Sequence, residues 1–288
     1  MKVLLIGKGF IGNKLYNFLK DKLDISFFSR AELDYTNRKI LNDFLIAKNI
    51  NVVINCSGFI GYPNVDACEI EKEKCFFYNV SVPTLIAKVC ENNSIKFINV
   101  SSGCIYTGYE KEFTEKDEPN FGSCSLSSSY YSFSKHICEA LLKNTQSITL
   151  RIRMPFCGDV APRNLIYKVL KYDNIIDLEN SGTSVDDFSN FVENLLNHSN
   201  FLKIKGPLNV VNPGPLTCKL ISEYLSFNGL TNPNWKIVDI SDLKITAPRS
   251  NCILSDKKIK QLGLQLPCLA KSLKEAVAIF AKKYNDTL

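Results

Sequence analysis

The beginning of the chain constrains the fold more than any other stretch. Val3 to Ile6 is a continuous apolar run, typical of a strand buried on both faces. A Gly-x-Gly-x-x-Gly turn follows at once, and apolar residues at helical spacing continue to Leu19. Strand, glycine turn and helix in this order predict a dinucleotide-binding unit, with the pyrophosphate at the helix N-terminus. The residues expected to approach it are Gly7, Gly9, Phe10, Ile11 and Gly12.

Further apolar segments are predicted as strands at Ile25–Phe28, Val52–Cys56, Phe97–Val100 and Thr149–Met154. Helical segments such as Ser81–Cys90 lie between them. This alternation predicts an α/β fold with a doubly wound parallel sheet of the Rossmann type. Ligands of such sheets bind at the carboxyl ends of the strands. We therefore expect further cofactor contacts from Ser29, Arg30, Asp34, Cys56, Ser57, Gly58 and Met154.

The end of the second predicted strand bears on the choice of cofactor. An acidic residue near this position takes the ribose hydroxyls of NAD, whereas an arginine suits the 2′-phosphate of NADP. Arg30 stands at the end of the strand and Glu32 lies beyond it. We therefore predict NADP, with Arg30 at the 2′-phosphate. Because Glu32 lies nearby, NAD is the alternative cofactor.

A tyrosine and a lysine stand four residues apart, at Tyr131 and Lys135, in a segment predicted as helix. Residues at this spacing share a helix face. An ammonium beside the phenol would lower the tyrosine pKa from its usual value of about 10. Such a phenol can exchange a proton with a carbonyl or alcohol oxygen. Ser102, at the end of the Phe97–Val100 strand, would hydrogen-bond the same oxygen.

The chain leaves the alternating pattern near Pro155. We predict a cofactor-binding domain over residues 1–155 and a smaller substrate-binding lobe over 156–288, with residues 186–211 returning to the first domain. A helix is predicted at 186–196, a strand at 208–211 and a turn at 212–215. Residues 109–129 are predicted as a long loop. Asp66 and Glu69 have the spacing of a capping box and are assigned to structure.

Composition excludes several classes of protein. The 288 residues are 45% apolar with a formal net charge of +6, and no basic block interleaved with aromatic residues predicts nucleic-acid binding. The 11 cysteines are scattered and only two histidines are present, so we expect no metal site and read the cysteines as reduced thiols in a cytoplasmic protein. No apolar run is long enough to span a membrane, and no signal peptide is expected.

The glycine turn, Ser102 and the Tyr131/Lys135 pair together resemble the extended short-chain dehydrogenases/reductases. The chain is similar in particular to the plant and giant-virus UDP-4-keto-6-deoxy-D-glucose 3,5-epimerases/4-reductases, which make UDP-L-rhamnose. The segments that carry this similarity are 63–66, 68–69, 103–105, 150–155, 162–164 and 247–251. The resemblance implies NADPH, a UDP-linked 4-keto-6-deoxyhexose as substrate, and a homodimer. The glycine turn is one residue shorter than is usual in that family.

The resemblance also implies roles for individual residues. Ser102, Tyr131 and Lys135 would serve reduction, and Cys104 and Lys168 would exchange the protons at carbons 3 and 5. Asn164 and Arg249 would bind the substrate. Two alternatives stay open: a 4-reductase of another nucleotide 4-keto-6-deoxysugar, of the dTDP-rhamnose or GDP-fucose type, and a non-catalytic NADP-binding regulator. A 4,6-dehydratase is disfavoured, because Gly103-Cys104 follows Ser102 where that family has an Asp-Glu pair.

Overall fold

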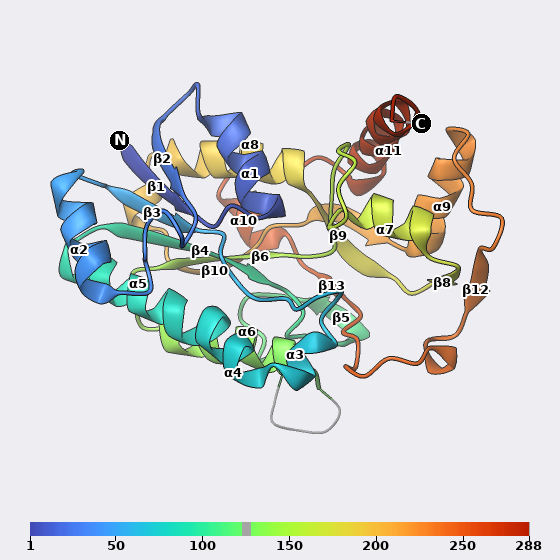
Figure 1. Cartoon of the computed structure of the whole chain (residues 1–288), viewed down its shortest axis with the longest axis horizontal. Coiled ribbons are helices and arrows are strands. Elements are labelled where there is room, and N and C mark those ends of the chain that lie inside the picture. The colour runs from blue at the N-terminus through green and yellow to red at the C-terminus, as the bar shows by residue number, and fades with distance from the viewer. Residues whose placement is uncertain (123–127, 288) are drawn as a thin grey trace.

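Six parallel strands form the main sheet in the order β2–β1–β3–β4–β6–β10, which lies in the left part of Figure 1. The computed structural model describes residues 1–122 and 128–287. The strands of this sheet are β1 (Lys2–Ile6), β2 (Asp24–Phe28), β3 (Val52–Asn55), β4 (Lys96–Ser102), β6 (Ile148–Ile152) and β10 (Gly206–Asn209). The prediction of a doubly wound parallel sheet is confirmed.

Helices cover both faces of this sheet because its strands are apolar on both faces. Successive residues of β1 alternate between two cores: Val3 and Leu5 join one, Leu4 and Ile6 the other. The first core is closed by α1 (Phe10–Leu19), α8 (Val185–Leu196) and α10 (Lys257–Gln261). The second is closed by α2 (Arg38–Ala47), α5 (Val82–Asn92) and α6 (Tyr130–Leu142). Two short helices and a π-helical turn lead into α5, namely α3 (Ala67–Ile70), α4 (Lys72–Phe76) and Phe77–Ser81.

A smaller group of elements lies beyond the carboxyl end of the main sheet (Figure 1). Its core gathers around a three-stranded sheet in the order β11–β9–β7. The elements are β7 (Pro155–Phe156), β9 (Asn180–Ser184), β11 (Asn212–Leu216), α7 (Leu165–Lys171), α9 (Cys218–Phe227) and α11 (Leu269–Asn285). Two strand pairs complete it, β8 (Asn174–Ile176) with β12 (Lys236–Val238), and β5 (Gly108–Phe113) with β13 (Cys252–Leu254). Short 3-10 turns lie at Phe201–Lys203 and Ile240–Asp242.

The chain passes between the two groups more than once. It leaves the main sheet after β6, visits the small sheet, and returns through α8 and β10. It then leaves again at β11. The division into a cofactor domain and a substrate lobe stays a prediction.

Three local predictions need correction. Residues 212–215, predicted as a turn, lie in β11, an edge strand that pairs with β9 at Asn212 and Leu216. Strand β5 occupies part of the predicted loop 109–129, of which residues 123–127 lie outside the described residues. Asp66 precedes α3 without capping it by a side-chain hydrogen bond, so no capping box forms. No helix of the described residues is long and apolar enough to cross a membrane.

Candidate active site

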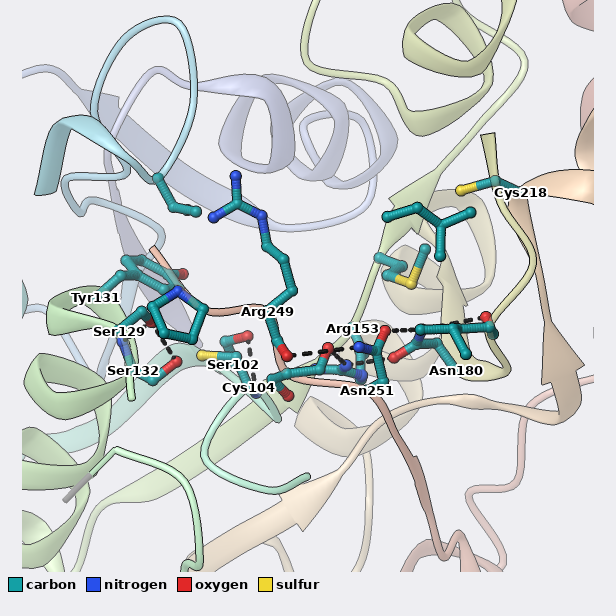
Figure 2. A pocket seen from close by; sticks show the side chains of 16 residues that line it. Ser102, Cys104, Ser129, Tyr131, Ser132, Arg153, Asn180, Cys218, Arg249 and Asn251 are labelled. Atoms are coloured by element: carbon teal, nitrogen blue, oxygen red, sulfur yellow. Dashed lines mark hydrogen bonds between the residues drawn. The ribbon is translucent and has the colours of Figure 1, made fainter. Parts of the chain in front are cut away.

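A cavity of about 330 Å³ lies at the carboxyl ends of β4 and β6, facing β8 and β9. Ser102, Cys104 and Tyr131 lie at one end of it in Figure 2, and Asn180 and Cys218 at the other. This is the edge where open α/β sheets bind their ligands. The structure therefore brings together three of the five residues predicted to be catalytic.

The turn after β4 projects Cys104 beside Ser102. The backbone N–H of Cys104 donates to Ser102 Oγ at 3.3 Å, and that of Gly103 donates to the Ile152 carbonyl at 3.1 Å. A Cβ on Gly103 would lie 2.3 Å from a methyl group of Leu254, so a larger residue here would require the Leu254 side chain to move. The close packing of this glycine fixes where the thiol stands.

Helix α6 places Tyr131 in its first turn and Lys135 one turn later. Ser129 caps the helix by accepting the Ser132 N–H at 3.1 Å. The Lys135 ammonium is buried and lies 5.6 Å from the centre of the Tyr131 ring. Tyr131 and Lys135 thus share a face, as predicted from their spacing.

The predicted lowering of the Tyr131 pKa is wrong for this structure. Burial raises the pKa of Tyr131 well above 10, and the nearby thiols of Cys104, Cys68 and Cys75 raise it further. The Ser102 hydroxyl opposes this only in part. The phenol is therefore protonated near neutral pH, which suits a proton donor.

The glycine turn after β1 forms an open cradle at the start of α1. Gly7 has a φ of +100°, and a Cβ there would lie 2.5 Å from the Ser57 nitrogen at the end of β3. A Cβ on Gly12 would lie 2.0 Å from the Gly7 carbonyl oxygen. At Gly9, by contrast, a Cβ would meet nothing within 4 Å. Among the described residues no side chain caps α1, and its first turn has no acidic residue, so the backbone amides at this helix N-terminus suit a pyrophosphate.

Of the other predicted cofactor residues, some are packed in the core and others lie at the cavity or beside Lys135. Phe10 and Ile11 begin α1, and Ile11 packs against the first core. Cys56 is also packed there, and burial raises its pKa to about 12. A Cβ on Gly58 would lie 3.5 Å from Lys135 Nζ. The segment that follows β3 therefore lies beside the Lys135 ammonium. Met154 lines the cavity and adopts a φ of +39°.

Charged groups gather at the end of β2. Glu32 accepts from Lys8 Nζ at 2.6 Å and from the Ser29 N–H at 2.8 Å, and these bonds lower its pKa to about 2. The carboxylate is thus already engaged within the chain. The Arg30 guanidinium lies 5.0 Å from the centre of the Tyr78 ring. Asp34 accepts from Thr36, which together with the Arg30 charge lowers the Asp34 pKa.

Arg249 reaches over the cavity from the segment before β13 (Figure 2). Its Nη1 donates to Asp66 Oδ1 at 2.7 Å and to the Ala247 carbonyl at 2.6 Å. Asp66 also accepts the Ala247 N–H at 3.0 Å. Asp66, which we assigned to helix capping, instead holds Arg249 and the segment that carries it.

Asn164 does not reach the cavity. Its side chain is completely buried and caps α7, where Oδ1 accepts the N–H groups of Cys157 and Ile166 at 3.2 Å. Its Nδ2 donates to the carbonyls of Cys157 and Asp159 at 2.7 Å. Because these bonds use the whole amide, the prediction that Asn164 contacts substrate is replaced by a structural role.

Lys168 lies on α7, outside the set of side chains that line the cavity. Burial and the charge of Arg163 lower its pKa. Arg163 itself donates to the Gly61 carbonyl at 2.9 Å, and its other terminal nitrogen is buried without a partner in the described residues. A lysine with a lowered pKa is better suited to act as a base than a solvated one.

Sequence reasoning missed the wall of the cavity formed by Arg153, Asn180 and Asn251. Arg153 Nη2 donates to the side-chain oxygen of Asn180 and to the Ser250 carbonyl. Asn180 Nδ2 donates to Asn251 Oδ1 at 2.9 Å. Arg153 and Asn251 stand in segments that carry the family resemblance, but nothing local to the sequence indicated that they meet.

Comparisons with known proteins show which family the chain is similar to. The family model of the RmlD substrate binding domain matches residues 1–281. The chain is 31% identical over 288 residues to a trifunctional UDP-glucose 4,6-dehydratase/UDP-4-keto-6-deoxy-D-glucose 3,5-epimerase/UDP-4-keto-L-rhamnose-reductase of Arabidopsis thaliana, covering 95% of this chain and 41% of that protein. It therefore spans about two fifths of the length of that relative.

Two further relatives are covered more fully. The chain is 32% identical over 234 residues to the bifunctional dTDP-4-dehydrorhamnose 3,5-epimerase/dTDP-4-dehydrorhamnose reductase of Arabidopsis thaliana, covering 77% of this chain and 74% of that protein. The crystal structure of a UDP-rhamnose synthase from Acanthamoeba polyphaga mimivirus superimposes with a TM-score of 0.85 at 25% identity, covering 97% of this chain and 99% of that one.

Proposed function

The chain belongs to the RmlD substrate binding domain family, and on that premise we propose that it is an NADPH-dependent 4-keto reductase of a nucleotide-linked 6-deoxysugar. The observation that carries the proposal is the meeting of Ser102 and Tyr131 in one cavity, with Lys135 behind them. A non-catalytic regulator would have no use for a buried, protonated phenol beside a serine hydroxyl.

The residues of the site divide the work of reduction. NADPH, when bound, supplies a hydride to carbon 4 of the sugar. Tyr131 gives its phenolic proton to the ketone oxygen, and its raised pKa keeps that proton available near neutral pH. Ser102 holds the same oxygen by its hydroxyl, and the Lys135 ammonium supports the phenolate that Tyr131 leaves behind.

The cradle after β1 would hold the pyrophosphate of the cofactor, and the end of β2 its adenosine. Arg30 brings a guanidinium to this end, where Lys8 and the Ser29 N–H already donate to Glu32. Glu32 is occupied by Lys8 and Ser29, so it is a poor partner for a free ribose hydroxyl. These contacts support NADPH over NADH, with Arg30 as a ligand of the 2′-phosphate.

The finer proposal is that the protein also epimerises its substrate, converting UDP-4-keto-6-deoxy-D-glucose to UDP-L-rhamnose. A proton leaves carbon 3 or 5 for a base, the bonding electrons spread onto the ketone oxygen as an enolate, and an acid returns a proton to the opposite face. Cys104 lines the cavity beside Tyr131 and suits one of these roles. The family resemblance gives the other role to Lys168, which lies on α7 outside the side chains that line the cavity and whose pKa is lowered by burial and by Arg163.

Arg249 would bind the diphosphate of the substrate. Its Nη1 is held by Asp66 at 2.7 Å, which leaves the other edge of the guanidinium fork for phosphate oxygens. The pairing fixes the direction of the side chain across the cavity (Figure 2).

We propose a homodimer in the cytoplasm. Ile70, Phe76, Phe77 and Leu141 are large apolar side chains that are exposed on the neighbouring helices α3, α4 and α6 and the π-helical turn. Contact of these side chains with a second copy of the chain would remove them from water. The ten free cysteines among the described residues accord with a reducing compartment.

The test is incubation with UDP-4-keto-6-deoxy-D-glucose and NADPH, followed by NMR identification of the sugar. UDP-L-rhamnose is the expected product. Formation of a reduced sugar with unchanged configuration at carbons 3 and 5 would favour the reductase-only alternative. Parallel reactions with the dTDP- and GDP-linked ketosugars decide the nucleotide, and no NADPH oxidation with any of them would refute the enzyme. Light scattering in the same buffer reports the mass, and a monomer would refute the dimer.

A further inference from the structure

One arginine in the wall of the cavity lacks a counter-ion. Arg153 is 5% exposed and follows directly after β6. Its Nη2 donates to two neutral oxygens, the side-chain oxygen of Asn180 and the Ser250 carbonyl. Its buried Nε–H meets no acceptor, and none of the ion pairs within residues 1–122 and 128–287 includes it. The cavity wall thus carries a buried positive charge that the chain does not neutralise.

The neighbouring arginines are treated differently. Arg151, only two residues earlier and 1% exposed, pairs with the Glu139 carboxylate through both Nε and Nη2. Arg249, on the same cavity, pairs with Asp66 at 2.7 Å. Removing one partner of a buried pair is costly because it strands a charge. Of Arg151, Arg153 and Arg249, Arg153 is the one without a carboxylate partner. This difference indicates a ligand that supplies the missing negative charge.

The place of this charge in the sheet identifies which end of the ligand it meets. Ser102 on β4 is paired in register with Ile152 on β6. Arg153 and Cys104 therefore follow the ends of adjacent strands, next to the Ser102 that is proposed to hold the ketone oxygen. Figure 2 shows Arg153 in the wall between Cys104 and Asn180. The charge stands between Cys104 and Asn180, while Arg249 is the group proposed for the diphosphate.

The sugar ring of a 4-keto-6-deoxyhexose is neutral, so negative charge arises on it only during the reaction. We propose that Arg153 is a further catalytic residue, which contacts the sugar and stabilises the enolate formed when a proton leaves carbon 3 or carbon 5. The inference rests on the proposed epimerisation. When the C–H bond breaks, the proton passes to Cys104 or Lys168 and the electron pair spreads onto the ketone oxygen. A fixed cation favours that state over the neutral ground state, which is the condition for lowering the barrier.

Three variants separate this role from a structural one. Arg153→Gln removes the charge, Arg153→Lys keeps it, and Asn180→Asp supplies a carboxylate to the guanidinium while leaving Arg153 in place. Deuterium uptake from heavy water into UDP-4-keto-6-deoxy-D-glucose, without cofactor, measures enolate formation. Oxidation of UDP-L-rhamnose by NADP⁺ measures hydride transfer from a sugar that needs no epimerisation. Melting temperature and NADPH affinity report the fold.

We expect Arg153→Gln and Asn180→Asp to slow deuterium uptake about 10²-fold, the effect of removing one preorganised donor to an oxyanion. Arg153→Lys should recover part of this rate, and hydride transfer should change far less in all three. If the wild type takes up deuterium and Arg153→Gln takes it up at the same rate, this inference is overturned while the epimerase proposal stands. Equal losses of both reactions and of melting temperature in all three variants would assign Arg153 to structure and also overturn it. If the wild type takes up no deuterium, the epimerase proposal fails and the inference fails with it.

Discussion

The guanidinium of Arg249 donates to the carboxylate of Asp66 at 2.7 Å, across 183 residues of chain. Asp66 stands before α3, beside the loop that follows β3, and Arg249 lies on the segment before β13. The pair therefore joins the main sheet's side of the cavity to the segment that closes it. Burial alone would raise the pKa of Asp66, but the bonds from Arg249 and from the Ala247 N–H together lower it.

Replacement of Asp66 by asparagine should release Arg249 from its position. The KM for the nucleotide sugar should rise several-fold, while NADPH affinity stays unchanged because the pair lies away from the cradle. The free energy of unfolding should fall by no more than about 1 kcal/mol, since the pair is partly exposed. Because the folded Asp66 pKa is lowered, the stability from this pair is present above the unfolded pKa, about 3.9, and is lost as pH falls through the folded value.

The control for Asp66 is Asp43→Asn, which breaks the exposed Lys39–Asp43 pair on α2. That variant should leave KM unchanged. An unaltered KM in Asp66→Asn as well would mean that Arg249 needs no orientation by the carboxylate.

Arg30→Ala should narrow the preference for NADPH over NADH. Loss of a hydrogen-bonded contact to a phosphate costs about 1.5–3 kcal/mol, or roughly ten- to hundredfold in the ratio of the two affinities. The ratio is measured by titrating both cofactors with intrinsic fluorescence. Arg38→Ala, an exposed arginine at the start of α2, is the control that should keep the wild-type ratio. A wild type that binds both cofactors equally contradicts the assignment.

Tyr131→Phe should abolish reduction and retain NADPH binding. The phenol is the proton donor to the ketone oxygen, and general acids of this kind contribute about 10²–10⁴ in rate. Deuterium uptake should fall less than reduction, because the variant keeps Cys104 and Lys168. Stopped-flow measurement of NADPH oxidation gives the first rate, and mass spectrometry of the sugar gives the second. Reduction at the wild-type rate would remove Tyr131 from the mechanism.

Cys104→Ala should stop deuterium uptake at carbon 3 or carbon 5, or at both, without weakening NADPH binding. The thiol lines the sugar cavity beside Tyr131 and stands apart from the glycine cradle. NMR of the recovered sugar assigns the label to each carbon. Cys268→Ala, at an exposed cysteine, serves as the control and should label both carbons. Full deuterium labelling of both carbons 3 and 5 by Cys104→Ala would favour the reductase-only alternative.

Arg163→Gln should move the pH dependence of deuterium uptake to higher pH. The Arg163 charge adds to burial in lowering the pKa of Lys168, so its removal raises that pKa. A base must be deprotonated to act, and the rising limb of the profile follows its pKa. The measurement is the uptake rate across neutral and alkaline pH in wild type and variant. An identical limb in both proteins would show that Lys168 is not the titrating base.

The parts of the fold predicted correctly depend on local sequence. Val3–Ile6 and its glycine turn are read from neighbouring residues, because a strand buried on both faces is apolar without interruption. Strand β11 was predicted as a turn because it contains Pro213 and Pro215. Proline lacks the N–H of a ladder bond, but an edge strand can leave that position unpaired.

The parts predicted wrongly depend on partners far along the chain. Asp66 has the spacing of a capping residue, and only the fold brings Arg249 to it. The Tyr131 pKa was expected to follow Lys135, yet burial is the largest influence on this pKa and raises it. Asn164 stands in a segment typical of substrate binders, but its amide is used within the chain. Burial and long-range pairing are properties of the whole fold, which residue spacing does not contain.

The return of the chain to the main sheet through α8 and β10 has a practical consequence for protein production. A fragment ending at residue 155 would lack β10, so β6 would become an open edge of the sheet. It would also lack Phe188 and Leu195 of α8, which share a core with Leu15 and Leu19 of α1. An uncovered edge and an uncovered apolar helix both promote aggregation. The cofactor-binding part is therefore expected to be insoluble when expressed alone, and ligand measurements require the intact chain.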